Sequence, residues 1–138
     1  MPQPTTQARR TGHPGYSETL PRAPQSAAAA RRLLRTACAV WGLDDLAEDG
    51  ALIVSELVAN AVQHACQGSI RVVVERPATR TVHIAVSDFS RARPVERESG
   101  EGDEDGRGLF LVAALAADWG TEERSWGKIV WATLGERG

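Results

Sequence analysis

The sequence predicts a single α+β two-layer sandwich, in which helices pack against one β-sheet. Two long stretches rich in Ala and Leu carry the spacing of helices. Shorter stretches further along have the pattern of strands and group into two hairpins. With 138 residues, of which 42% are hydrophobic, the chain is long enough for one domain with a full core and too short for two.

The chain begins with a segment that has little tendency to fold. Residues 1–15 are polar and punctuated by Pro and Gly, which predicts a flexible tail. The folded domain is therefore expected over residues 16–138. Its first element is a short strand at residues 16–20, which Pro21 ends.

Two helices are expected next. An Ala-, Arg- and Leu-rich stretch predicts a helix over residues 26–41, with Gly42 at its end. Asp44 or Asp45 can cap the following helix, because a short acidic side chain accepts hydrogen bonds from the first free N–H groups. That second helix is expected to end near Gly68.

The second half of the chain predicts two antiparallel hairpins separated by a loop and a helix. The expected strands are residues 70–75, 81–87, 118–122 and 128–134. Residues 88–106 form a charged segment without periodicity, and a helix is expected over residues 109–116. Because long structureless loops are uncommon in compact domains, such a segment is typical of a lid or a binding loop.

Composition excludes several classes of function. A net charge of −2 argues against sequence-independent binding to nucleic acid, which needs a basic surface. Neither a signal peptide nor an apolar run of membrane-spanning length is present. The two cysteines, Cys38 and Cys66, have no metal-ligand spacing, which favours reduced thiols. A cytoplasmic protein without a membrane partner is expected.

Polar side chains on the second helix are the first sign of a site. Residues 51–65 are almost wholly apolar, but they include Glu56, Asn60 and His64. At about 100° per residue, these three side chains form a stripe along the edge of the apolar face. A polar group buried there costs a few kcal/mol unless it has a partner. A bound metal ion and phosphate would supply one.

The end of the loop and the end of one strand carry the other candidates. Gly106, Arg107 and Gly108 precede Leu109, which opens a helix, and free N–H groups at a helix N-terminus favour an anion such as phosphate. Asp88 directly follows the strand 81–87 and could accept a hydrogen bond from an exocyclic amine such as that of adenine.

Each candidate also has a purely structural interpretation. Asp88 could close its strand with an Asx-turn, and the glycines could serve only turn and cap geometry. His64 could be a satisfied core histidine. Glu56 and Asn60 could be hydrogen-bond partners of the neighbouring backbone.

Taken in order, these motifs resemble the Bergerat ATP-binding fold of the GHKL superfamily, and within it the stand-alone anti-sigma-factor serine/threonine kinases. The resemblance implies a mixed, mostly antiparallel sheet with helices on one face. The motifs that carry it are Leu-Pro-Arg-Ala-Pro (20–24), Trp-Gly-Leu (41–43), Val-Ser-Glu-Leu-Val-Ala-Asn-Ala-Val-Gln-His-Ala (54–65), Val-Ser-Asp (86–88), Gly-Arg-Gly-Leu (106–109) and Gly-Lys-Ile-Val-Trp-Ala (127–132).

The resemblance also implies roles for individual residues. Asn60 matches the amide that coordinates Mg²⁺ beside the ATP phosphates, and Glu56 matches the acid that activates the attacking hydroxyl or water. Asp88 matches the aspartate that recognises adenine. Contacts with the nucleotide phosphates are implied for His64 and for Gly106, Arg107, Gly108 and Leu109.

The function implied is that of an ATP- and Mg²⁺-binding regulator. It would transfer the γ-phosphate to a Ser or Thr of an anti-sigma-factor antagonist and hold a sigma factor inactive, and a homodimer is compatible with this role. Two alternatives stay open. One is a sequestering module without turnover, and the other is a detached histidine-kinase catalytic domain. The second is less favoured because no helical phosphoacceptor domain precedes the fold.

Overall fold

The computed structural model describes residues 5–8, 13–63, 68–89 and 109–135. A short helix over residues 109–115 lies between the fourth and fifth strands. The labelled elements are β1 Thr5–Ala8, β2 Pro14–Pro21, α1 Ser26–Trp41, the 3₁₀ helix η1 Asp44–Leu46, α2 Ala47–Gln63, β3 Ser69–Ala78, β4 Thr81–Asp88, β5 Asp118–Arg124 and β6 Gly127–Gly135.

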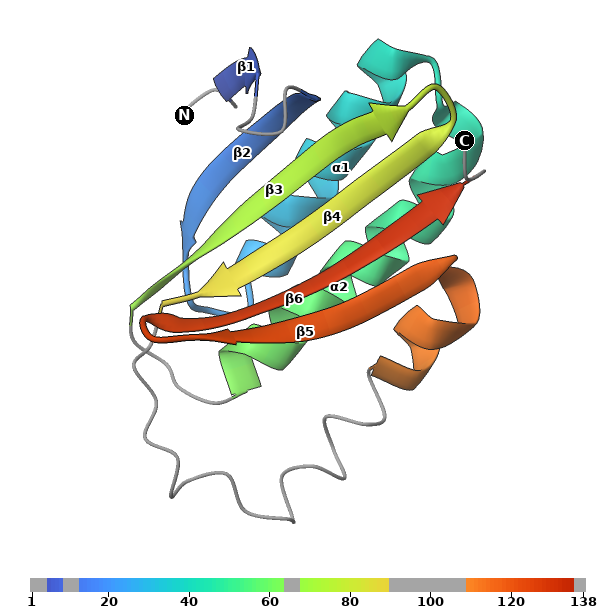
Figure 1. Ribbon diagram of the computed structural model, residues 1–138. Coiled ribbons are helices and arrows are strands. Elements are labelled where there is room, and N and C mark those ends of the chain that lie inside the picture. The colour runs from blue at the N-terminus through green and yellow to red at the C-terminus, as the bar shows by residue number, and fades with distance from the viewer. Residues whose placement is uncertain (1–4, 9–12, 64–67, 90–108, 136–138) are drawn as a thin grey trace.

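The strands form one six-stranded sheet in the order β1-β2-β3-β4-β6-β5. Helices α1 and α2 lie side by side across one face of this sheet (Figure 1). The predicted α+β two-layer sandwich with helices on one face is therefore confirmed. The mixed character of the sheet is not seen, because every strand pair in the described residues is antiparallel.

Local sequence signals set the helix boundaries. Helix α1 ends at Gly42, which adopts a left-handed φ of 71°. The N–H of Gly42 donates to the carbonyl of Ala39, and the N–H of Leu43 donates to that of Cys38, so the last carbonyls of the helix have partners. The expected cap at Asp44 or Asp45 instead forms the 3₁₀ turn η1, which leads directly into α2.

The two helices approach each other closely at Gly50. A Cβ atom there would lie 2.8 Å from Cδ1 of Leu34, so only glycine fits without displacing the leucine. Behind the helices, alternate residues of β3 and β4 point into the same core, as the period of a strand requires. These fully buried strand residues are Ile70, Val72, Val74, Val82, Ile84 and Val86.

Part of the segment expected to be a tail belongs to the sheet. Residues 5–8 form β1, which pairs antiparallel with β2 from Thr5 opposite Ser17 to Ala8 opposite Pro14. Backbone pairing to an open sheet edge needs no hydrophobic pattern, so a polar composition does not reveal it. None of the helices in the described ranges is long and apolar enough to cross a membrane.

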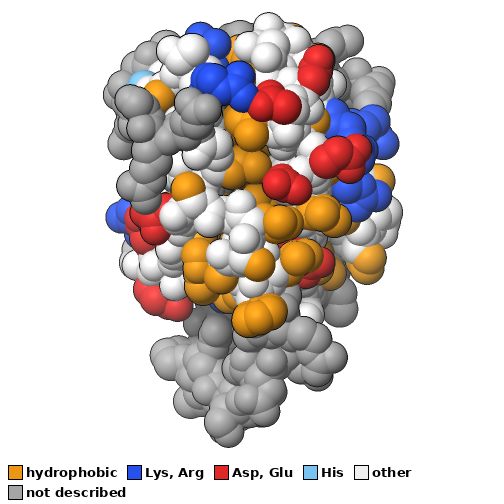
Figure 2. Space-filling view, turned by 90° about the vertical axis from the view of Figure 1, so that its right-hand side faces the viewer, with side chains coloured by type: hydrophobic (Ala, Val, Ile, Leu, Met, Phe, Trp, Pro, Cys, Tyr) orange, Lys and Arg blue, Asp and Glu red, His pale blue; other side chains and the backbone are white. Residues whose placement is uncertain are grey.

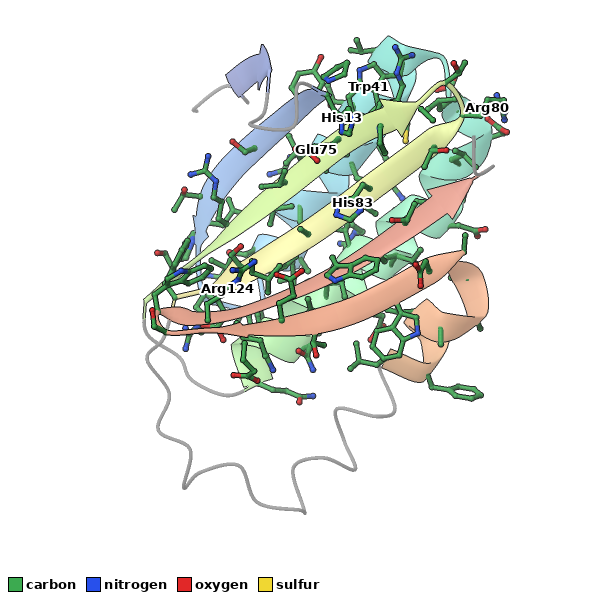
Figure 3. All side chains as sticks on the ribbon, in the orientation of Figure 1. His13, Trp41, Glu75, Arg80, His83 and Arg124 are labelled. Atoms are coloured by element: carbon green, nitrogen blue, oxygen red, sulfur yellow. The ribbon has the colours of Figure 1, made fainter. Side chains whose placement is uncertain are left out.

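The other face of the sheet carries its own polar side chains. Glu75 of β3 and His83 of β4 are direct partners in the strand register, and both lie on the face that the helices leave uncovered (Figure 3). The His83 ring stacks on Trp131 with 5.5 Å between centroids, and its Nδ1 lies 2.8 Å from the hydroxyl of Thr133.

Candidate functional site

Helix α2 places Glu56 and Asn60 one turn apart on the same stripe. Glu56 is half-buried, whereas Asn60 is only 5% exposed. The Oδ1 atom of Asn60 is buried and finds no hydrogen-bond partner within the part of the chain that the structure describes. A buried carbonyl oxygen without a partner is uncommon in folded proteins and costs about 1–3 kcal/mol. The backbone-partner interpretation therefore does not account for this oxygen.

Apolar packing holds the helix on one side of the stripe. Ile53, Leu57 and Ala61 of the same helix belong to the buried core. Next to Glu56, the Oγ of Ser55 accepts a hydrogen bond of 2.8 Å from Nη1 of Arg31 in α1. This contact ties the two helices together beside the carboxylate, so the backbone that presents Glu56 and Asn60 is well anchored.

Asp88 ends β4 and is buried, with 6% of the residue exposed. Its Oδ1 forms an ion pair and hydrogen bond with Nη2 of Arg22, which lies in the loop between β2 and α1 and is 2% exposed. An Asx-turn alone therefore does not describe Asp88. Arg22 is not among the residues that the sequence predicts for the site, and its one signal is its place within the Leu-Pro-Arg-Ala-Pro motif.

Three further segments fix the position of Asp88. In the sheet register it lies opposite Ile70 of β3 and opposite Lys128 of β6. Gly127, at the start of β6, passes so close that a Cβ atom there would lie 1.8 Å from the carbonyl oxygen of Asp88. The N–H of Arg22 donates to the carbonyl of Gly68 at 3.0 Å, which brings the Arg22 loop to the start of β3.

Three elements that carry candidate residues have ends at the same end of the molecule. The C-terminal end of α2, the end of β4 and the start of the helix at residues 109–115 all lie at the lower end in Figure 1. Leu109 is partly buried and packs against the core, as expected for the residue that opens this helix. Four predicted site residues lie outside the described residues: His64, Gly106, Arg107 and Gly108.

Hydrophobic side chains reach the surface beside this end. Figure 2 shows them gathered on the lower half of the edge where residues 109–115 lie. Phe110 of this helix is exposed, and so is Phe89, which directly follows Asp88. Phe89 and Trp126 contact each other with ring centroids 5.2 Å apart.

The described residues fit a magnesium site that uses few protein ligands. They contain no group of three or more His, Cys, Asp or Glu side chains able to enclose a metal ion. Mg²⁺ does not need such a group, because it is commonly held by one or two protein oxygens, waters and the phosphates of a substrate. The buried Oδ1 of Asn60, which has no partner among the described atoms, has the right chemistry for one of those oxygens.

Residues 20–134 match the protein family described as the histidine kinase-like ATPase domain. The matched range spans most of the chain, from the end of β2 to the end of β6, and it includes Arg22, Glu56, Asn60 and Asp88. No curated protein matches the chain.

Proposed function

Because the chain belongs to the family of histidine kinase-like ATPase domains, we propose that it binds ATP with Mg²⁺ and acts as a protein serine/threonine kinase of the anti-sigma-factor type. It transfers the γ-phosphate to a Ser or Thr of an antagonist protein, and a sigma factor is its second protein partner. The motifs at residues 54–65, 86–88 and 106–109 support this narrower role by resemblance.

The observation that carries the nucleotide part of the proposal is the buried amide of Asn60. Its Oδ1 has no partner among the described residues, although the helix around it is closely packed. An oxygen left in this state is explained if it holds a Mg²⁺ ion that also contacts the ATP phosphates. The ion, when bound, neutralises charge on the phosphates during transfer.

Glu56 supplies the proton chemistry in this proposal. The hydroxyl oxygen of the acceptor forms a bond to the γ-phosphorus while the bond from that phosphorus to the ADP oxygen breaks, and the hydroxyl proton moves to the Glu56 carboxylate. A general base has to lie within hydrogen-bond reach of that proton. Its place one turn before Asn60 puts Glu56 beside the expected metal.

A thermal-shift and calorimetric titration tests the binding step. Mg-ATP should raise the melting temperature of the wild-type protein, because a ligand that binds only the folded state stabilises it. Asn60→Ala should abolish this rise. Gln63→Ala is the matched control, since Gln63 is an exposed amide three residues further along the same helix. Absence of heat and of thermal protection in folded wild-type protein would refute ATP binding.

A phosphate-transfer assay tests the kinase step. The protein is incubated with labelled ATP and a candidate antagonist, and the label should appear on a Ser or Thr of that antagonist. Glu56→Gln should retain ATP binding and lose transfer, whereas Glu48→Gln, an exposed acid at the start of α2, should change neither. Label on a histidine would indicate histidine-kinase chemistry. Partner binding without any labelled product would indicate a sequestering module.

A further inference from the structure

The buried guanidinium of Arg22 has more N–H donors than its bond to Asp88 satisfies. Its Nη2 donates to Oδ1 of Asp88, but Nε and Nη1 are buried and find no acceptor within the described residues. A guanidinium carries N–H donors on all three nitrogens in a rigid plane. The ion pair therefore satisfies one end of this plane and leaves the other two nitrogens facing no described acceptor.

Buried charged donors without acceptors are rare, because the loss of their hydration is not compensated. Arg22 is also fixed in place, since its backbone N–H donates to the carbonyl of Gly68 and its side chain is pinned by Asp88. The side chain thus cannot reach out to bulk water to satisfy Nε and Nη1. These donors point to an acceptor that arrives with a ligand.

We propose that Arg22 recognises the base of the nucleotide together with Asp88. This inference rests on the proposed ATP binding. Asp88 accepts a hydrogen bond from the exocyclic amine of adenine, and Arg22 donates to the ring nitrogen that flanks this amine. Adenine offers an amine donor beside a ring-nitrogen acceptor, and this arrangement complements a carboxylate beside a guanidinium.

Asp88 can serve both partners at the same time. An ionised carboxylate has about four lone-pair positions on its two oxygens, so it can accept hydrogen bonds from several donors at once. The proposal therefore needs no rupture of the ion pair when the nucleotide binds. Arg22 would then be a specificity-determining residue. It lies in the loop between β2 and α1, far in the sequence from the Gly-Arg-Gly-Leu motif at residues 106–109.

The experiment measures dissociation constants by calorimetry for Mg-ATP, Mg-7-deaza-ATP and Mg-1-deaza-ATP. Each analogue lacks one of the two ring nitrogens that flank the amine. The wild-type protein should bind one of these analogues about 10-fold to 100-fold more weakly than ATP, the range expected for a hydrogen bond from a charged donor. In Arg22→Met that difference should disappear, while ATP itself binds about as weakly as the affected analogue.

Two further variants separate recognition from structure. Arg22→Lys keeps a positive charge beside Asp88 but lacks the planar fork, so it should fold and still show a reduced preference for ATP over the analogue. If Arg22→Met does not fold, the Arg22→Lys variant replaces it in the comparison of affinities. Arg71→Met is the matched control, because Arg71 is a partly buried arginine of β3 whose Nη2 donates to the hydroxyl of Ser17, and it should leave all affinity ratios unchanged.

The outcomes distinguish this inference from the proposed function. Failure of the wild-type protein to bind ATP at all would overturn both. Two results would overturn only the role of Arg22. In the first, the wild-type protein binds ATP normally and binds both analogues as tightly as ATP. In the second, the difference between ATP and an analogue persists in Arg22→Met. Tighter binding of GTP than of ATP would overturn the assignment of the pair to adenine.

Discussion

Arg22 and Asp88 form an ion pair inside the protein although they lie 66 positions apart in the sequence. Both side chains are buried, and the pair joins the loop after β2 to the last residue of β4. Asp88→Ala should lower the free energy of unfolding by about 3–5 kcal/mol, because it leaves a buried guanidinium without its counter-charge. Urea denaturation followed by tryptophan fluorescence measures this change.

The double variant shows whether the pair itself is responsible. Arg22→Met with Asp88→Leu removes both charges, so it should be much more stable than the sum of the single losses predicts. Glu122→Ala is the control, because Glu122 pairs with Arg124 on the surface. Exposed pairs contribute between 0 and about 1 kcal/mol. Additive losses for Arg22 and Asp88 would show that the two side chains do not interact.

Asn60 is expected to weaken the ligand-free fold. Its buried Oδ1 has no partner among the described residues, so Asn60→Leu should raise the free energy of unfolding by about 1 kcal/mol. The same variant should show no thermal response to Mg-ATP. Gln63→Leu, which alters an exposed amide of the same helix, should leave both quantities unchanged. A less stable Asn60→Leu protein would mean that the amide has a structural partner.

Local signals in the sequence predict much of this fold. Helix α1 begins at Ser26 and ends at Gly42 as predicted, because a helix terminus depends on the few residues around it. The two hairpins are also found, with β3 beside β4 and β5 beside β6. Asn60 can be recognised as a candidate in the same way, because a polar residue in an apolar helix is visible within a short stretch of sequence.

Contacts between distant segments could not be predicted in this way. The pairing of β4 with β6 joins strands that are separated in the sequence by residues 89–126, and no local pattern encodes it. The burial of Arg22 could not be predicted for the same reason. It lies in a loop, and only the packing of that loop against β3 and β4 buries it beside Asp88.

Gly127, the first residue of β6, should not tolerate a side chain. A Cβ atom there would lie 1.8 Å from the carbonyl oxygen of Asp88, so Gly127→Ala must displace the end of β4. We expect a loss of about 3 kcal/mol or more in the free energy of unfolding. Gly42→Ala is the matched control, since Gly42 also has a positive φ but faces open space. It should cost only about 1–2 kcal/mol. Equal losses in the two variants would exclude the clash at Asp88.

Cys38 should be unreactive in the folded protein. Burial raises the pKa of the Cys38 thiol to about 11, and the charges of Asp44 and Asp45 add to this effect. The thiolate is the reactive form of cysteine, so a disulfide reagent near pH 8 should label Cys38 only after denaturation. The assay uses the Cys66→Ser variant, in which Cys38 is the remaining cysteine. Rapid labelling in native buffer would show that Cys38 is accessible and ionised.

His83 should make the folded state sensitive to acid. Burial lowers the pKa of His83 below its ordinary value of 6.5, and the nearby His13 adds to the effect, while Glu75 and Glu122 oppose it. The unfolded chain therefore takes up a proton at His83 at a higher pH than the folded protein does. Stability that is present above pH 6.5 is lost as the pH falls through the lowered pKa of the folded state.

His83→Asn tests this linkage because asparagine does not titrate. Urea denaturation is repeated at several pH values between about pH 7.5 and pH 5, the range in which an ordinary histidine changes charge. The wild-type protein should lose more stability than the variant over this range. The reason is that a charged imidazole is disfavoured at the partly buried position beside Trp131 and Thr133. Thr133→Val keeps the imidazole and should retain the pH dependence. Identical pH profiles for wild type and His83→Asn would assign the acid sensitivity to other groups.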